Sequence, residues 1–169
     1  MIESVLVPVD HSEQAERAFD FAIEAYPDAD LTVLYVLDLP STGYRTGREN
    51  GPPEPNADLE VLVSEATDFL DDYVEKGRAA GVSVTSDHEI AHERGTVARA
   101  ILDYAEGTET DHIVIGSHGR SGASRVLLGS VAETVTRRSP VPVTVAPSAS
   151  ASVSRRSRSS TNRSPTWIL

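Results

Sequence analysis

Apolar and polar positions follow two alternating periods along the chain. Short, nearly continuous apolar runs are typical of strands covered on both faces, whereas apolar residues at i, i+3, i+4 and i+7 mark one face of a helix. The runs are Ser4–Val9, Leu31–Leu37, Val82–His88, His112–Ile115 and Val141–Val145. The helical patterns cover residues 15–26, 58–81, 96–105 and 130–138. This alternation predicts one α/β domain with an open parallel sheet and right-handed crossovers.

Two signals concern the ends of these elements. Ser12 stands where its hydroxyl would cap the first helix. Pro142 lacks a backbone donor, so the last strand is expected at an edge of the sheet.

Two stretches show neither period. Asp38–Ala57 holds three glycines and four prolines, and a loop of this length is expected to be either a functional lid or disordered. From Ser148 the chain is rich in serine and arginine and has no apolar face. That segment is either an arm for an acidic or phosphate-bearing partner or a dispensable extension. We expect a domain over residues 1–147 and a disordered tail over residues 148–169.

The charge is strongly acidic. Four of the 15 basic residues and none of the 26 acidic residues lie beyond Pro147, so residues 1–147 carry 11 positive and 26 negative charges, a net charge of −15. Such a surface repels nucleic acid and anionic lipid, so we expect neither as a partner. Lys76 is the only lysine. Acidic excess with almost no lysine indicates a halophilic protein, and ordinary compositional drift is the alternative.

Composition excludes further classes of protein. There is no cysteine, which rules out a disulfide scaffold, thiolate catalysis and cysteine-ligated metal. No apolar run approaches the roughly 18 residues of a membrane span. The first residues do not read as a signal peptide, so we expect a cytoplasmic protein.

The strongest chemical signal begins where the fourth predicted strand ends. The chain there reads Gly116-Ser117-His118-Gly119, then nine residues, then Gly129-Ser130. Glycines permit tight turns and close approach to a ligand, neighbouring N–H groups form anion-binding nests, and a helix beginning at Ser130 would attract phosphate. The spacing predicts a phosphate-binding cradle. The alternative is that the glycines only end strands and that Ser130 and Glu133 form a capping box.

The ends of the first two predicted strands favour a nucleotide. Doubly wound sheets bind ligands beyond the carboxyl ends of strands, where the strand order reverses. If the first and fourth strands are neighbours, Asp10 faces Gly116 across this crevice and suits ribose hydroxyls. Val36 would cover an adenine face. The alternative for Asp10 is that it only caps the first helix.

The chain resembles the universal stress protein (UspA) family, in its ATP-binding branch. The matching segments are VLVPVDHSE, LYVLD, SPVPVTVAP and above all GSHG-x9-GSVAETV, which reproduces the family motif G-2x-G-9x-G-[ST]. The resemblance covers Ile2–Pro147. It implies a Rossmann-like, adenine-nucleotide alpha-hydrolase-like sheet of five strands in the order 3-2-1-4-5, with helices on both faces. It also implies a homodimer that pairs through the fifth strand, Val141–Val145.

The resemblance further implies the residues that hold ATP, with Mg²⁺ carried by its phosphates. The adenosine would contact Pro8, Val9, Asp10 and Val36. The ribose and phosphates would lie among Gly116, Ser117, His118, Gly119, Arg120, Gly129, Ser130 and Val131. Many family members carry a small residue at the position of His11. This histidine would either crowd the turn after Asp10 or contact the ligand.

One motif of the sequence points to a different chemistry. His88-Glu89-Ile90-Ala91-His92 matches the zinc-protease pattern H-E-x-x-H, which requires a helix. Here the segment continues a predicted strand, so we expect no metal site, and His112 is interpreted as structural. There is no P-loop sequence, so Arg120 is the best-placed cation for the phosphates.

We therefore predict a nucleotide-binding module that acts as a stress-response sensor or switch with a protein partner that the sequence does not identify. Asp10, His11 and His118 are conceivable bases, but no third group is placed to hold any of them, so no catalytic residue is assigned. The alternatives are a slow ATP hydrolase of the same superfamily and a nucleotide-free interaction domain.

Overall fold

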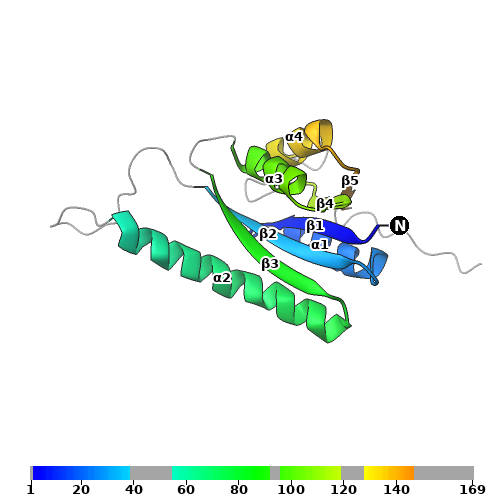
Figure 1. Cartoon of the computed structure of the whole chain (residues 1–169), viewed down its shortest axis with the longest axis horizontal. Helices are drawn as coiled ribbons and strands as arrows, with labels where there is room; N and C mark the ends of the chain where they lie inside the picture. The colour runs from blue at the N-terminus through cyan, green and yellow to red at the C-terminus, as the bar shows by residue number, and fades with distance from the viewer. Residues whose placement is uncertain (1, 39–54, 92–95, 119–127, 147–169) are drawn as a thin grey trace, which may run out of the picture.

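The strands form one parallel sheet in the predicted order. The computed structural model describes residues 2–38, 55–91, 96–118 and 128–146. Strands β1 (Ser4–Val9), β2 (Asp30–Asp38), β3 (Val84–Ala91), β4 (His112–Gly116) and β5 (Val143–Ala146) pair in the order β3-β2-β1-β4-β5 (Figure 1). All four pairings are parallel. The expected fold class is confirmed.

Helices cover both faces of the sheet. Helices α1 (Glu13–Ala25) and α2 (Pro55–Ala80) lie on one face, and α3 (Thr96–Gly107) and α4 (Ser130–Arg138) lie on the other (Figure 1). Along β1, Val5, Val7 and Val9 belong to the core under α1 and α2, whereas Leu6 belongs to the core under α3 and α4. This is the two-residue period of a strand buried on both sides.

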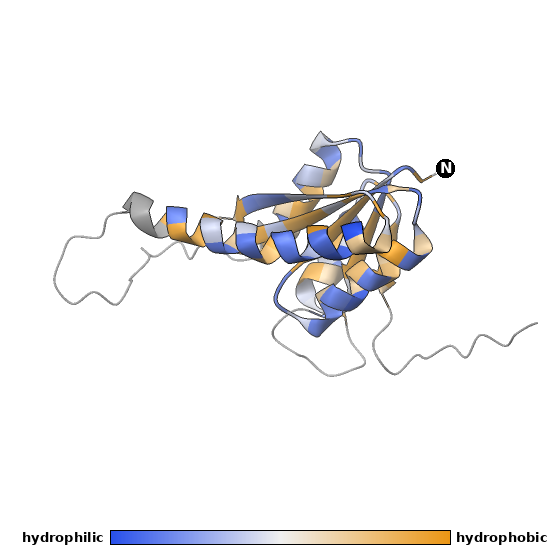
Figure 2. Cartoon of the chain, turned by 90° about the horizontal axis from the view of Figure 1, so that it is seen from below, coloured by the Kyte–Doolittle hydropathy of each residue, from blue (hydrophilic) through white to orange (hydrophobic). Residues whose placement is uncertain are grey.

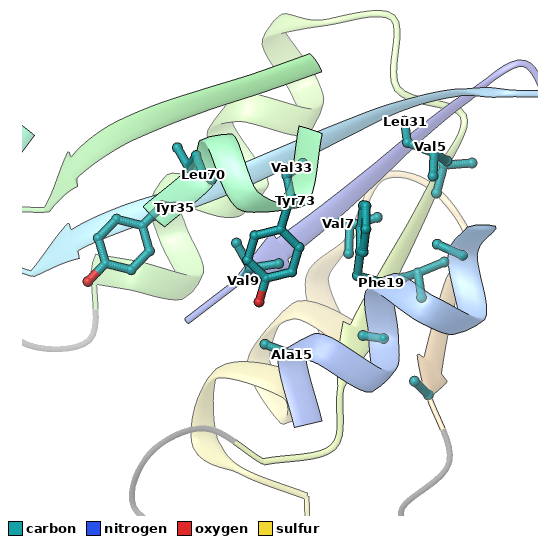
Figure 3. Close-up of a cluster of buried hydrophobic side chains, with 14 of the residues drawn as sticks. Val5, Val7, Val9, Ala15, Phe19, Leu31, Val33, Tyr35, Leu70 and Tyr73 are labelled. Atoms are coloured by element: carbon teal, nitrogen blue, oxygen red, sulfur yellow. The ribbon is translucent and has the colours of Figure 1, made fainter. Parts of the chain in front are cut away.

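Aromatic rings join α1 and α2 over the sheet. The ring of Phe19 on α1 is fully buried and meets the ring of Tyr73 on α2 edge-on, with centroids 5.0 Å apart (Figure 3). Both rings lie over the side chains of Val7 and Val9 (Figure 3). Large apolar rings in this arrangement contribute much of the stabilisation of a core.

Helix α2 is amphipathic and packs closely on β3. Its buried residues Ala66, Leu70 and Tyr73 belong to the core that α2 shares with the sheet. The beginning of the helix extends past the sheet (Figure 2). A Cβ atom added at Gly77 would lie 2.1 Å from Cγ2 of Val84, so the close approach requires glycine. Gly81 follows the helix with φ of 76°, the left-handed conformation that commonly ends helices.

Most predicted boundaries hold to within two residues, and the larger differences lie at α2 and β3. Pro55–Ala57 were assigned to the irregular stretch but form the first turn of α2, where proline is well tolerated. Strand β3 is displaced by two to three residues along the chain. Strand β5 begins after Pro142, whose carbonyl accepts a hydrogen bond from Ile113 N at 3.0 Å. The expected edge position of this last strand is confirmed.

Other expectations fall outside the described ranges. Most of the proposed lid (39–54) and the whole tail (148–169) belong there. Among the described residues, no helix combines the length and apolar character needed to cross a membrane.

Candidate functional site

A cavity of about 320 Å³ opens beyond the carboxyl ends of β1, β2 and β4, where the strand order reverses. We call it the site cavity. The predicted residues that line it are Pro8, Val9, Asp10, Val36, Gly116, His118, Gly129, Ser130 and Val131. Asp10 and Gly116 thus line one cavity because β1 and β4 are neighbours, as expected. Of the other predicted residues, Ser117 is not in the lining, and Gly119 and Arg120 lie outside the described residues.

One end of the site cavity is polar and contains the start of α4. Helix α4 begins at Ser130, as predicted, and its N-cap residue is Gly129, which has no side chain to cap the helix. The capping-box alternative is therefore wrong, because Ser130 is already the first helical residue. The first turn of α4 lines the cavity, so its helix dipole favours an anion there.

The two glycine-containing bends are hydrogen-bonded to each other. Gly129 N donates to the carbonyl of Ser117 at 2.8 Å. The amide of Gly129 is thus already used, which corrects the expectation that it is available to a phosphate. Ser117 connects the two bends and also contacts His118, because its Oγ lies 3.1 Å from His118 Nδ1.

His118 presents a buried nitrogen without a partner. Its Nδ1 is paired with Ser117, whereas its Nε2 is buried and has no hydrogen-bond partner among the described residues. Buried polar atoms are nearly always hydrogen-bonded in folded proteins. Since His118 lines the site cavity, a bound ligand can supply the missing partner.

The other end of the site cavity is apolar, and sequence reasoning found only part of it. Leu34 and Val36 on β2 form it together with Val97 and Ile101 on α3, and Ile115 on β4, next to Gly116, is a further apolar residue of the lining. Asp38 also belongs to the lining. One further step of the two-residue period through Leu34 and Val36 would have indicated Asp38, but the predicted strand ended at Leu37.

Asp10 does not cap α1. Ser12 is the N-cap, and its Oγ accepts a hydrogen bond from Ala15 N at 3.2 Å, as predicted. Oδ1 of Asp10 accepts from Ser12 N at 3.1 Å and from the Ser12 hydroxyl. The capping alternative for Asp10 is therefore wrong: the carboxylate positions the capping serine and lines the cavity.

Gly116 is required by packing rather than by a tight turn. A Cβ atom there would lie 2.8 Å from the carbonyl oxygen of Gln14, so glycine allows α1 to approach β4. Among the described glycines only Gly81 has a positive φ, and Gly129 has an ordinary φ of −62°. The expectation that Gly116 supplies an unusual backbone turn is wrong.

Three other histidines lie outside the site cavity. His11 is exposed, its ring packs against Phe69 with centroids 4.1 Å apart, and it is not among the residues that line the site cavity, so both alternatives for it stay predictions. His88 lies in β3, which confirms a strand there, while His92 is outside the described residues. His112 Nε2 lies 3.2 Å from the Tyr26 hydroxyl and 2.9 Å from Thr144 Oγ1, which supports a structural role.

Comparisons with known proteins agree on one family. The family model described as the universal stress protein family matches residues 1–147. A universal stress protein of Methanocaldococcus jannaschii is 31% identical over 152 residues, which cover 86% of this chain and 82% of that protein.

Solved structures share the fold. The universal stress protein UspA from Lactobacillus plantarum has a TM-score of 0.67 at 29% identity, covering 86% of this chain and 98% of that one. A universal stress protein family protein from Arabidopsis thaliana, solved with AMP bound, has a TM-score of 0.59 at 19% identity, covering 90% of this chain and 97% of that one.

Proposed function

Because this chain belongs to the universal stress protein family, we propose that it is a nucleotide-binding member that holds ATP in the site cavity and acts as a stress-response sensor or switch. The observation that carries the proposal is the buried Nε2 of His118, which lines the site cavity together with the first turn of α4 and has no hydrogen-bond partner among the described residues. A phosphate oxygen there would accept a hydrogen bond from the ring and interact favourably with the helix dipole.

The residues present fit a nucleotide. The volume of about 320 Å³ lies at the lower end of the range for small-molecule sites. The apolar end, formed by Leu34, Val36, Val97 and Ile101, suits a flat base, and the polar end suits phosphates, which would carry Mg²⁺. Asp10 directly follows β1, the strand between β2 and β4, and its carboxylate suits ribose hydroxyls.

Binding is a better proposal than rapid hydrolysis. A hydrolase needs a base that orients the attacking water. In the described part of the site, Asp10 is engaged by Ser12 and Nδ1 of His118 by Ser117. The AMP in the Arabidopsis protein shows that this fold accommodates a nucleotide, but the proposal for this chain rests on its own cavity.

Native mass spectrometry and calorimetric titration test the proposal. We expect ATP or ADP to co-purify with the full chain, and we expect added ATP with Mg²⁺ to bind to the stripped protein. Phosphate release should be no faster than in buffer. The proposal is wrong if the purified protein carries no nucleotide and millimolar ATP produces neither a heat of binding nor thermal stabilisation.

The proposed active form is a cytoplasmic homodimer that pairs through β5. This strand has one neighbour in the sheet, and its valines 143 and 145 are only partly buried. An apolar edge strand is usually covered, since it otherwise pairs nonspecifically. Light scattering should give about twice the chain mass of 18.1 kDa, and Val143→Glu should give the monomer. Ser86→Glu, on the opposite edge strand β3, is the matched control and should leave the dimer intact.

A further inference from the structure

One acidic side chain in the site cavity has no role in the proposed function. Asp38 is the last residue of β2, and it shares one face of the strand with Leu34 and Val36. Leu34 is fully buried and Val36 is 8% exposed, whereas Asp38 is exposed. These three side chains therefore extend from the buried floor of the apolar end to its rim, and the carboxylate of Asp38 lies at that rim.

Asp38 differs from the other carboxylate of the cavity. Oδ1 of Asp10 is engaged by the amide and hydroxyl of Ser12. Across the described residues, by contrast, no hydrogen bond or ion pair reaches the carboxylate of Asp38. The described lining also contains no lysine or arginine. A ligand at the apolar end thus meets a carboxylate that no donor of the described residues engages.

A carboxylate has a defined preference among the parts of a nucleotide. It only accepts hydrogen bonds at neutral pH, so it attracts N–H groups and repels phosphate oxygens. The phosphates are therefore directed to the opposite end, where His118 and the first turn of α4 lie. The group left at the rim is the edge of the base, and the exocyclic amino group of adenine is a donor of the required kind.

We propose that Asp38 is the specificity-determining residue for the base: its carboxylate accepts a hydrogen bond from the exocyclic amino group of adenine. This inference rests on the proposed function, since it requires a nucleotide whose base occupies the apolar end. Because the carboxylate is at the rim and remains hydrated, its effect is expected at the lower end of the range for hydrogen bonds to charged groups, about tenfold in affinity.

The test compares two ligands that differ only in that amino group. Calorimetric titration of the full chain with ATP and with purine riboside 5′-triphosphate should show about tenfold tighter binding of ATP. Asp38→Ala should reduce this ratio to about one, mainly by weakening ATP. Asp38→Asn keeps an acceptor oxygen without the charge, so it should retain a ratio of roughly three.

Asp30→Ala is the matched control, because Asp30 is an exposed aspartate at the other end of β2 and its loss changes the net charge equally. It should keep the tenfold ratio. An unchanged ratio in Asp38→Ala, or equal binding of both ligands by the unaltered chain, would overturn the role of Asp38 while leaving nucleotide binding in place. If neither ligand binds the unaltered chain, the proposed function fails and this inference fails with it.

Discussion

Two histidines each have a buried ring nitrogen without a hydrogen-bond partner in the described residues, and their surroundings differ. His118 Nε2 lines the site cavity, so a ligand can reach it. His112 Nδ1 lies at the start of β4, at the opposite end of that strand from the cavity, and the other ring nitrogen of His112 is held by Tyr26 and Thr144. The same local feature therefore supports the proposed ligand contact of His118, whereas in His112 it accompanies structural packing.

Replacing His118 should weaken phosphate binding selectively. In His118→Ala, the affinity for ATP should fall about tenfold, because a hydrogen bond to a charged oxygen is lost, while the affinity for adenosine should stay nearly unchanged. Calorimetric titration with both ligands measures the difference. His11→Ala removes an exposed histidine outside the cavity and should change neither affinity. Equal losses for ATP and adenosine in His118→Ala would assign His118 to the fold instead.

Burial of His112 should make stability fall in mild acid. Desolvation lowers the pKa of His112 below its usual value of 6.5. The unfolded chain therefore binds a proton at a pH where the folded chain does not, so stability is retained above pH 6.5 and declines as the pH falls toward the folded-state pKa. Urea unfolding at pH 7.5 and 5.5 should show this decline. His112→Gln should show a smaller decline in the free energy of unfolding between these two pH values. An equal decline in the variant and the unaltered chain would exclude His112 as its source.

At the scale of elements, single close contacts set how the helices lie on the sheet. Gly116 allows α1 to approach β4, and Gly77 allows α2 to approach β3. Neither glycine has a positive φ, so both are required by the space between elements rather than by backbone conformation. A side chain at either position would displace a helix from the sheet.

Adding one methyl group at Gly77 tests this contact. Gly77→Ala should destabilise the fold by about 1–3 kcal/mol, because the new carbon would lie 2.1 Å from a methyl group of the stiff Val84 side chain. Gly107→Ala places the same group in open space at the end of α3 and should be neutral. Urea unfolding gives both values. Equal free energies of unfolding for the two variants would mean that α2 can shift on the sheet without a loss of stability.

At the scale of the whole molecule, the acidic charge has little local compensation. The ion pairs of the described residues are three helix pairs four residues apart and Lys76–Asp20, and every partner is at least 40% exposed. Exposed pairs contribute little to stability. Residues 1–147 therefore carry repulsion that dissolved salt would screen.

The thermal midpoint should consequently rise as potassium chloride is increased from about 0.1 M, where the Debye length is about 10 Å, to about 1 M, where it is about 3 Å. Sucrose at matched osmolality separates screening from solute exclusion, because it carries no charge. A rise no larger in salt than in sucrose would contradict the halophilic interpretation.

Sequence reasoning was strongest where one local cause dominates. The helix from Ser130 to Arg138 and the strand from Ser4 to Val9 were predicted at their observed bounds, because a clear apolar period is bounded by strong terminal signals. It was weaker where the role of a residue depends on contacts between segments that are distant in the sequence. The role expected for Gly116 was wrong, since it depends on Gln14. The contact of His11 with Phe69 was not predicted, because no local pattern connects these two residues.

By itself, the order of apolar and polar residues determined the elements and the parallel sheet, because those features follow from periods within the chain. The strand order, and with it the segments that meet at the carboxyl edge of the sheet, was implied by the resemblance to a known family. Only the tertiary structure decided which atoms at that edge remain available. It placed Asp38 at the rim, engaged Asp10 with Ser12, used the amide of Gly129, and left Nε2 of His118 without a partner in the described part of the chain. The physical reason is that hydrogen-bond satisfaction depends on distances between segments, and those distances exist only after the elements have packed.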